Sequence, residues 1–143
     1  MDKVYEKIKD IVESLDYYLY QIIYETRDDG KVLSVEIDHD NGIDIDDCVT
    51  VSHAISAYLD EADPIDESYG LEVTSPGAEK ELRNYEEIKR AHGDYVHVET
   101  FEQTLEGTLE NVSRDSITIR NKNKQTITIL MADITMIRLA IDF

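Results

Sequence analysis

Residues 42–77 read GIDIDDCVTVSHAISAYLDEADPIDESYGLEVTSPG, and this stretch decides how the rest of the chain is organised. Asp44 is a good N-cap residue, because its carboxylate can accept a hydrogen bond from the amide of Asp47. Asp46 and Asp47 then place negative charge in the first turn, where the helix dipole favours it. The sequence therefore predicts a helix that begins at Ile45.

This helix is predicted to be amphipathic, because apolar residues recur in it at spacings of three and four. Burying the apolar side against a sheet would stabilise the helix by about 2 kcal/mol for each large side chain. The step from Asp63 to Pro64 ends the helix, since the residue before a proline is pushed out of the helical region. The residues predicted to face the core are Ile45, Cys48, Val49, Ser52, Ile55 and Leu59.

A domain boundary is predicted directly after one further strand. Residues 70–74 alternate in polarity, and Ser75, Pro76 and Gly77 then stop any further pairing. These three turn residues are also candidates for partner binding, although the need for a turn at a boundary would explain them as well. The predicted domains are residues 1–77 and 84–143, with a linker at about residues 78–83.

The chain before residue 42 reads helix, strand, strand. The first helix has Asp2 as a candidate N-cap, and its apolar positions share one face as far as Ser14. Residues 17–26 and 32–38 are rich in aromatic and β-branched residues, and the sequence DDG at residues 28–30 signals a hairpin turn. The first half is therefore predicted to be a small α/β sandwich of the order αββαβ.

The second half changes to a β pattern. Asn84 can cap a short helix that is ended by Gly93. Period-two alternation then predicts five short strands. Closing five antiparallel strands into a small barrel would remove exposed sheet edges. The predicted strands are residues 95–101, 104–112, 116–120, 126–130 and 135–141.

The composition is that of a folded and strongly acidic protein. Its 143 residues are 41% hydrophobic and 32% charged, which leaves enough apolar content for folded cores. No apolar run approaches the roughly 18 residues of a membrane span, and the start MDKVYEKIKD is unlike a signal peptide. We therefore expect a cytoplasmic protein without a membrane segment. The single cysteine, Cys48, cannot form an internal disulfide and is expected to be a small core residue.

Charge is distributed unevenly along the chain. Residues 1–76 contain 20 acidic and 5 basic residues, a net charge of −15, whereas residues 77–143 contain 12 acidic and 9 basic residues, a net charge of −3. So acidic a domain repels free nucleic acid and attracts basic protein, while the nearly neutral half could touch phosphate locally. The acidity could instead serve solubility alone.

The sequence shows no pattern typical of an enzyme or a cofactor site. The acidic residues from Asp38 to Asp47 invite a calcium interpretation, but the EF-hand register fails. Gly42 would stand at position five rather than six, and Val49 would replace the bidentate glutamate. The four histidines are scattered with no nucleophile arrangement near them, and no phosphate-binding loop or dinucleotide fingerprint occurs. We therefore expect neither catalysis nor a metal or other cofactor.

Two groups of charged residues are candidate partner contacts. Asp46 and Asp47 would form an acidic group at the start of the central helix. A basic group in the second half could meet phosphates on one side of the barrel, or it could be a solvated rim. The basic candidates are Arg114, Arg120, Lys122 and Lys124, together with Arg83 at the end of the linker.

The chain resembles the RimP family of bacterial ribosome maturation factors in four separated stretches. They are the helix GIDIDDCVTVSHAISAYLD, the acid-Pro-Ile step at residues 63–65, the strand and turn YGLEVTSPG, and the chain end RLAIDF. They follow the family's order over nearly the whole chain. One departure is AEKEL at residues 78–82, where the family usually has leucine, an acid, arginine, proline and leucine.

The resemblance implies a first domain like the KH-type RNA-binding domains and an SH3-like or Sm-like second domain. The GXXG loop with which a KH domain grips RNA is missing from this sequence. The implied function is that of a monomeric, non-enzymatic factor that binds the immature small ribosomal subunit and assists its assembly. Its implied partner is a basic small-subunit ribosomal protein near the decoding centre, with ribosomal RNA as a further contact. From charge and fold alone, the alternative is an acidic protein-interaction module of the Sm or SH3 type that is unrelated to RNA.

Overall fold

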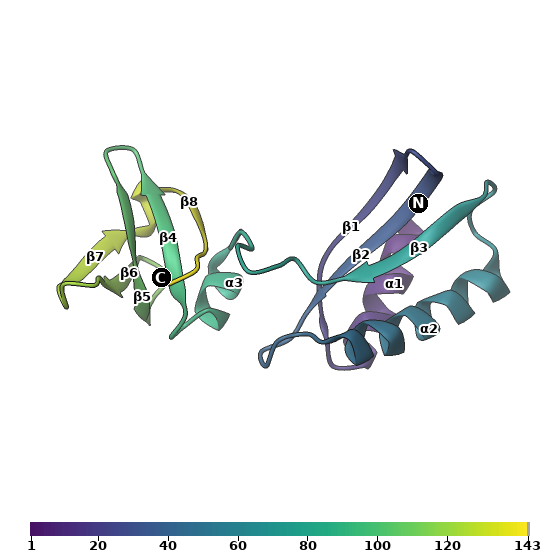
Figure 1. Ribbon diagram of the computed structural model, residues 1–143, viewed down its shortest axis with the longest axis horizontal. Coiled ribbons are helices and arrows are strands. Elements are labelled where there is room, and N and C mark those ends of the chain that lie inside the picture. The colour runs from purple at the N-terminus through teal and green to yellow at the C-terminus, as the bar shows by residue number, and fades with distance from the viewer. Residues whose placement is uncertain (143) are drawn as a thin grey trace. The chain divides into compact units, whose positions relative to one another are not determined.

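A computed structural model describes residues 1–142 of the chain. The chain divides into two compact units, Met1–Pro76 and Gly77–Phe143 (Figure 1). Each unit has its own cluster of buried apolar side chains, and together they belong to the α+β class, as the sequence predicts. That the two units are independently folding domains stays a prediction.

The first unit combines a three-stranded sheet with two helices. Its elements in chain order are α1 (Asp2–Ser14), β1 (Tyr18–Arg27), β2 (Gly30–Asp38), α2 (Ile45–Ala62) and β3 (Tyr69–Thr74). β1 and β2 form an antiparallel hairpin, and β3 pairs with β2 in the parallel direction, so the strand order is β1-β2-β3. The predicted order of elements, αββαβ, is therefore confirmed.

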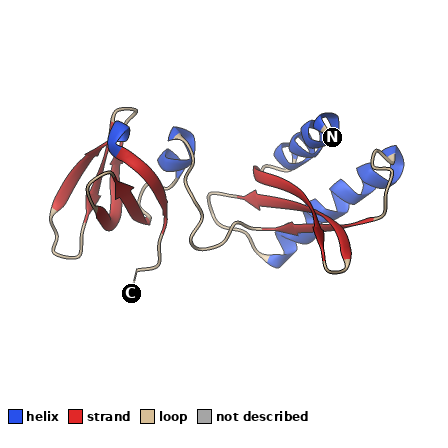
Figure 2. Ribbon diagram, turned by 90° about the horizontal axis from the view of Figure 1, so that it is seen from above, coloured by secondary structure: helices blue, strands red, loops and turns tan. Residues whose placement is uncertain are grey.

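One face of this sheet carries the core of the first unit. Leu33, Val35 and Ile37 follow every second position of β2 and are fully buried. Leu71 and Val73 of β3 lie in register with the first two of them and pack against the same cluster. Both helices cover this face of the sheet, as the ribbon shows (Figure 2). They contribute Val4, Ile8, Val12, Val51, Ile55 and Leu59 to the core.

The ends of α2 agree with the sequence prediction, whereas the start of α1 does not. Asp44 is the N-cap of α2 and accepts a hydrogen bond from the amide of Asp47, and Asp63 ends the helix with a left-handed φ of 44°. α1 begins at Asp2 itself, with Met1 at the N-cap position and no side-chain cap. The prediction that Asp2 caps α1 is therefore wrong. Its carboxylate lies in the first turn instead, where the helix dipole favours it.

The buried side of α2 also differs from the predicted one. Val51, Ile55 and Leu59 face the core, but Ile45 is 81% exposed and Val49 is 44% exposed, so the prediction that these two are buried is wrong. A helix turns by about 100° per residue, which places Ile45 about 120° away from Val51 around the axis. α2 therefore has two apolar sides, and the sheet covers one of them. The other residues of the predicted core side, Cys48 and Ser52, are half-buried.

The second unit is built on a five-stranded antiparallel sheet. After α3 (Tyr85–Arg90), its elements are β4 (Tyr95–Thr100), β5 (Thr104–Val112), β6 (Ser116–Arg120), β7 (Thr126–Leu130), the 3₁₀ turn η1 (Met131–Asp133) and β8 (Ile134–Leu139). The strand order is β7-β6-β5-β4-β8. Among residues 1–142, no backbone pairing joins the edge strands β7 and β8 into a closed ring. Asn84 caps α3 as predicted, by accepting a hydrogen bond from the amide of Glu87.

Part of the segment predicted as a linker makes contacts inside the second unit. The amide of Leu139 donates to the carbonyl of Lys80, and the amide of Leu82 donates to the carbonyl of Ile137. Glu81 forms a bridge with Arg138 between these two bonds. The side chain of Leu82 is buried in the core of the second unit. Residues 80–82 therefore lie along β8 as additional backbone pairing, which the mixed polarity of the sequence AEKEL does not indicate.

Candidate functional site

The start of α2 is held by a reciprocal pair of carboxylates. Asp44 Oδ1 accepts from the amide of Asp47 at 2.9 Å, and Asp47 Oδ2 accepts from the amide of Asp44 at 2.9 Å. The hydroxyl of Tyr17 donates to the remaining Asp47 oxygen, Oδ1, at 2.5 Å. Both carboxylate oxygens of Asp47 are thus used for structure. The side chain of Asp46 is exposed, and within residues 1–142 its carboxylate has no hydrogen bond or ion pair.

These contacts also determine the charge of the helix start. The hydrogen bond from the Tyr17 hydroxyl, followed by the one from the Asp44 amide, lowers the pKa of Asp47. The same hydrogen bond to Asp47 raises the pKa of Tyr17 to about 12. Asp47 is therefore a carboxylate at neutral pH while Tyr17 keeps its proton. The helix start therefore presents a fixed negative charge at neutral pH.

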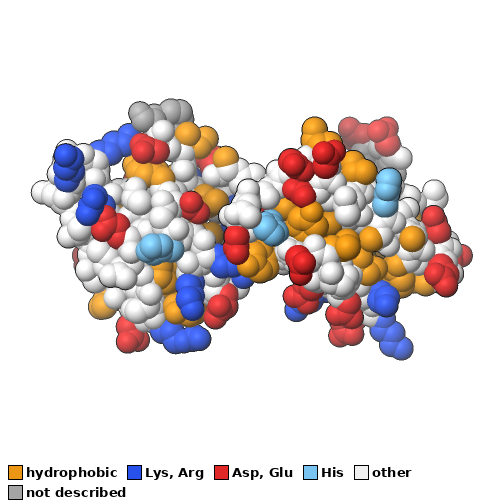
Figure 3. Space-filling model, turned by 90° about the horizontal axis from the view of Figure 1, so that it is seen from below, with side chains coloured by type: hydrophobic (Ala, Val, Ile, Leu, Met, Phe, Trp, Pro, Cys, Tyr) orange, Lys and Arg blue, Asp and Glu red, His pale blue; other side chains and the backbone are white. Residues whose placement is uncertain are grey.

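A hollow of about 570 Å³ lies between the first half of α2 and the end of β3. Ile45 and Val49 line it from the helix, and Val73 and Ser75 line it from the strand and the turn that follows. Asp44 adds a carboxylate to its wall. The space-filling view shows apolar side chains gathered on the α2 side of the first unit, with carboxylates around them (Figure 3). An apolar hollow with an acidic surround is suited to a basic partner that carries apolar side chains.

Sequence reasoning missed this hollow because it assigned Ile45 and Val49 to the core. The signal that could have found it is the excess of apolar residues on α2, which has both the Val51 side and the Ile45 side. Of the three turn residues predicted as partner contacts, Ser75 lines the hollow. Pro76 and Gly77 follow it in the chain, and Gly77 has a φ of 91° that a glycine tolerates well.

The basic candidates of the second unit do not form one cluster. Arg114 precedes β6 and lies over the Tyr85 ring at 4.3 Å from its centroid, whereas Arg120 ends β6 and pairs with Glu110 at 2.6 Å. A strand of five residues is about 13 Å long, so the two guanidinium groups belong to opposite ends of β6. Lys122 follows Arg120 in the β6–β7 turn and reaches Asp142 at 3.4 Å. Lys124 shares that turn, with a φ of 63°.

Residues 7–79 match the family model described as the RimP N-terminal domain. This chain belongs to the RimP family. The match covers the first unit from α1 to the segment after the Ser75-Pro76-Gly77 turn, and so includes the acidic helix start and the hollow. RimP proteins are a family of ribosome maturation factors, and the resemblance predicted from four stretches of sequence is thereby confirmed.

Arg83, the remaining basic candidate in this RimP protein, is committed to an internal contact. Its guanidinium reaches the Glu87 carboxylate at 2.6 Å, and its backbone amide donates to the same group at 2.8 Å. Burial opposes the charge on Glu87, but these bonds from Arg83 outweigh it and lower the pKa of Glu87. Arg83 therefore serves to hold the start of α3, and a role in partner binding would have to compete with that contact.

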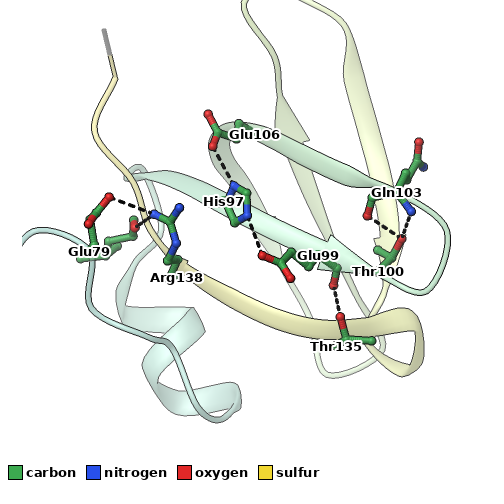
Figure 4. Close-up of polar contacts among 9 residues, drawn as sticks. Glu79, His97, Glu99, Thr100, Gln103, Glu106, Thr135 and Arg138 are labelled. Atoms are coloured by element: carbon green, nitrogen blue, oxygen red, sulfur yellow. Dashed lines mark hydrogen bonds and ion pairs between the residues drawn. The ribbon is translucent and has the colours of Figure 1, made fainter.

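His97 of the RimP chain lies between two carboxylates on the sheet of the second unit (Figure 4). Its Nδ1 is 2.7 Å from Glu106, and its Nε2 is 3.0 Å from Glu99. Beside this group, Thr135 donates to the backbone carbonyl of Glu99, which ties β8 to β4.

The described residues include no group of three or more His, Cys, Asp or Glu side chains arranged to hold a metal ion. Within the same residues, no helix is long and apolar enough to span a membrane.

Proposed function

We propose that this RimP protein binds the immature small ribosomal subunit in the cytoplasm and assists its assembly as a non-enzymatic factor. The observation that carries the proposal is the family match over residues 7–79, which spans nearly all of the first unit. The helix start also supports a binding role. The Asp44 and Asp47 carboxylates cap the helix and hold its start in place. The apolar side of α2 beside them is exposed and therefore accessible to a partner.

The partner that fits the first unit is a basic ribosomal protein, and we infer that it is the small-subunit protein near the decoding centre. Residues 1–76 have a net charge of −15, which attracts a strongly basic protein over distances longer than any single contact. Ribosomal RNA would be repelled by this unit. A local RNA contact would instead use the second unit, where Arg120, Lys122 and Lys124 share one end of β6.

We also propose the finer fold assignments that the family implies. The αββαβ order of the first unit is compatible with a KH-like domain, although it lacks the GXXG loop. The five short antiparallel strands, with a 3₁₀ turn before the last one, are compatible with an SH3-like or Sm-like barrel. As separate domains, the units should be cut by a protease near the Ser75-Pro76-Gly77 turn, because residues 80–82 are held along β8. Stable fragments that end inside α2 would contradict this division.

The function is tested by co-sedimentation of the full chain with small ribosomal subunits in gradients at low and high salt. Immature subunits should carry more of the protein than mature subunits, and high salt should reduce the bound fraction because it screens the acidic unit. Binding to neither kind of particle would contradict the proposal. Tight binding to a purified basic protein without any binding to particles would favour an acidic interaction module unrelated to the ribosome.

A further inference from the structure

The sheet of the first unit ends in a strand with an unused edge. β3 pairs with β2 from Tyr69 opposite Lys31 to Thr74 opposite Glu36, and no other strand within residues 1–142 pairs with its outer edge. The backbone N–H and C=O groups on that edge can therefore pair with another chain. Edge strands are often guarded by charged side chains, lysine above all, or by proline. The sequence of β3, YGLEVT, contains neither lysine nor proline, and its one charged residue, Glu72, is paired with Arg27 at 3.0 Å.

The second apolar side of α2 is left uncovered, since Ile45 is 81% exposed and Val49 is 44% exposed. Val51, Ile55 and Leu59 belong to the core cluster of the first unit, whereas Ile45 and Val49 are exposed on another side of the helix. The hollow lined by these two residues lies beside the carboxyl end of β3, which is an edge strand of the sheet. α2 thus offers apolar surface for one more strand than the sheet contains.

Carboxylates flank this place at both ends of β3. Asp44 lines the hollow near the carboxyl end of the strand. At the other end, burial together with the nearby carboxylates of Asp60 and Asp63 raises the pKa of Tyr69. The helix above the edge, IDDCVTVSHAISAYLDEA, contains no lysine or arginine. A strand that docks here would meet negative potential along its length, which favours lysine and arginine in it.

We propose that the free edge of β3 and the Ile45–Val49 side of α2 together form a docking site for an extended basic segment of a partner protein. The segment adds a fourth strand beside β3 and places alternate apolar side chains in the hollow. It needs about six residues, the length of β3, or about 20 Å of extended chain. The proposal rests on the proposed function for the identity of the partner, since a basic ribosomal protein would supply the segment.

Other occupants fit the edge less well. Nucleic acid is repelled by a unit with a net charge of −15, and a second copy of the chain would bring an equal charge to the same place. A basic protein segment instead supplies lysine and arginine for the carboxylates, apolar side chains for the hollow and a backbone for the edge. The binding of such a segment satisfies all three features of the site together.

Two synthetic peptides of about ten residues test the site on the full chain. One alternates lysine with valine, and its charge-matched control alternates lysine with serine. The lysine-valine peptide should bind about tenfold more tightly. It should shift the amide resonances of Ile45 and Val49 and slow amide hydrogen exchange along β3. Equal affinity for the two peptides would overturn the proposal, because charge alone would then explain binding.

Backbone pairing is tested by methylating the peptide amides. The N–H groups of alternate residues point to the same side of an extended strand. Methylation of the valine amides blocks one edge of the lysine-valine peptide, and methylation of the lysine amides blocks the other. One of the two methylated peptides should lose binding by at least about tenfold while the other keeps it. Binding that is unaffected by either change, or removed by both, would overturn addition of a strand.

Variants identify the surface and separate this proposal from the function. The double substitution of Ile45 and Val49 by serine should weaken peptide binding about tenfold without lowering the melting temperature, because both side chains are exposed. The control is a double substitution of Phe101 and Leu130 by serine, since these exposed apolar residues line a hollow of the second unit. The control should bind the peptide as the unaltered chain does. If it loses binding and the first variant does not, the proposed site is wrong.

Co-sedimentation with small ribosomal subunits completes the test. If the unaltered chain does not co-sediment, the proposed function fails, whatever the peptides do. If the unaltered chain and the Ile45 and Val49 double variant co-sediment equally, the function stands and the docking site is overturned.

A dimer of the full chain that the same double variant dissociates would assign the edge to a second copy. Altered amide resonances in the second unit of this variant, without peptide, would assign the hollow to that unit. Either result overturns the proposal.

Discussion

The two units of the chain bury cores of the same size beneath very different surfaces. Within residues 1–142, each core cluster contains ten buried apolar residues. The first unit nevertheless has a net charge of −15 and the second a net charge of −3. Excess charge of one sign destabilises a compact state through self-repulsion, so the acidity of the first unit lowers its own stability. The second unit has a core of the same size without such acidity, so the acidity of the first unit is not needed for folding. This difference favours a role of the acidity in binding.

Two isoleucines of α2 have opposite surroundings, and the first prediction concerns them. Ile55 is fully buried and Ile45 is 81% exposed. Ile55→Ala should lower the free energy of unfolding of the first unit by about 2–5 kcal/mol, because it leaves a cavity between α2 and the sheet. Ile45→Ala should change it by less than about 0.5 kcal/mol. Urea denaturation of both variants measures the difference, and equal losses would mean that α2 is rotated from the position described.

The second prediction compares two strand glycines, one in each unit. A Cβ on Gly107 of β5 would lie 2.5 Å from the carbonyl oxygen of Arg120, so the backbone of β5 or β6 must move. Gly107→Ala should destabilise the second unit by about 1–3 kcal/mol. Gly70 of β3 has nothing within 4 Å of such a Cβ, and Gly70→Ala should be tolerated. Thermal melting followed by NMR would show whether the first unit keeps its resonances when Gly107 is replaced.

Much of the fold could be predicted from the sequence because its signals are local. The Asp44 cap, the stop at Asp63 and the DDG turn each depend on neighbouring residues, and each occurs where the pattern places it. The side of α2 that is buried depends instead on where β3 lies beneath the helix. That position is a tertiary property, and the apolar residues of α2 fit two rotations of the helix. The period of three and four residues therefore led to the wrong pair, Ile45 and Val49.

The candidate site was predicted only in part, for the same reason. Asp46 and Ser75 were selected from cap and turn chemistry, and the structure places them near the start of α2 and in the hollow. The hollow itself is formed by two segments that are far apart in sequence, so no local pattern indicates it. The basic residues looked like one cluster because they are close in sequence, but β6 separates Arg114 from Arg120 by its whole length.

A third prediction concerns acid and alkaline stability of the first unit, through Tyr17 and Asp47. The pKa of Asp47 is lowered by folding, so its contribution to stability is present at neutral pH and is lost as the pH falls through the folded value. The pKa of Tyr17 is raised to about 12, so its contribution is complete below pH 10 and is lost as the pH rises toward 12. Tyr17→Phe should lower the melting temperature at pH 7. It should also make the loss of stability at low pH and the loss at high pH smaller.

The control for this prediction is Tyr24, whose hydroxyl donates to Glu67 and whose pKa is also raised to about 12. Tyr24→Phe should make the loss of stability at high pH smaller. It should not change the loss of stability at low pH that is due to Asp47. Ultraviolet absorbance during alkaline titration counts the tyrosines that ionise late, and each variant should remove one of them. A Tyr17→Phe variant with an unchanged acid profile would show that the bond to Asp47 does not stabilise the fold.

The smallest expected effect on stability separates the two acidic residues that sequence analysis treated together. Replacing Asp46 and Asp47 jointly by asparagine is an ambiguous test, because Asp47 completes the reciprocal cap and accepts from Tyr17. Asp47→Asn should therefore lower the melting temperature by itself, whether or not a partner touches it. Asp46→Asn should leave the melting temperature almost unchanged, since the carboxylate of Asp46 makes only a dipole interaction at the helix start.

If the acidic helix start belongs to the partner surface, Asp46→Asn should still weaken co-sedimentation with immature small subunits. An Asp46→Asn variant that melts and binds normally would remove this residue from the surface and leave the acidity of the first unit to act only at long range.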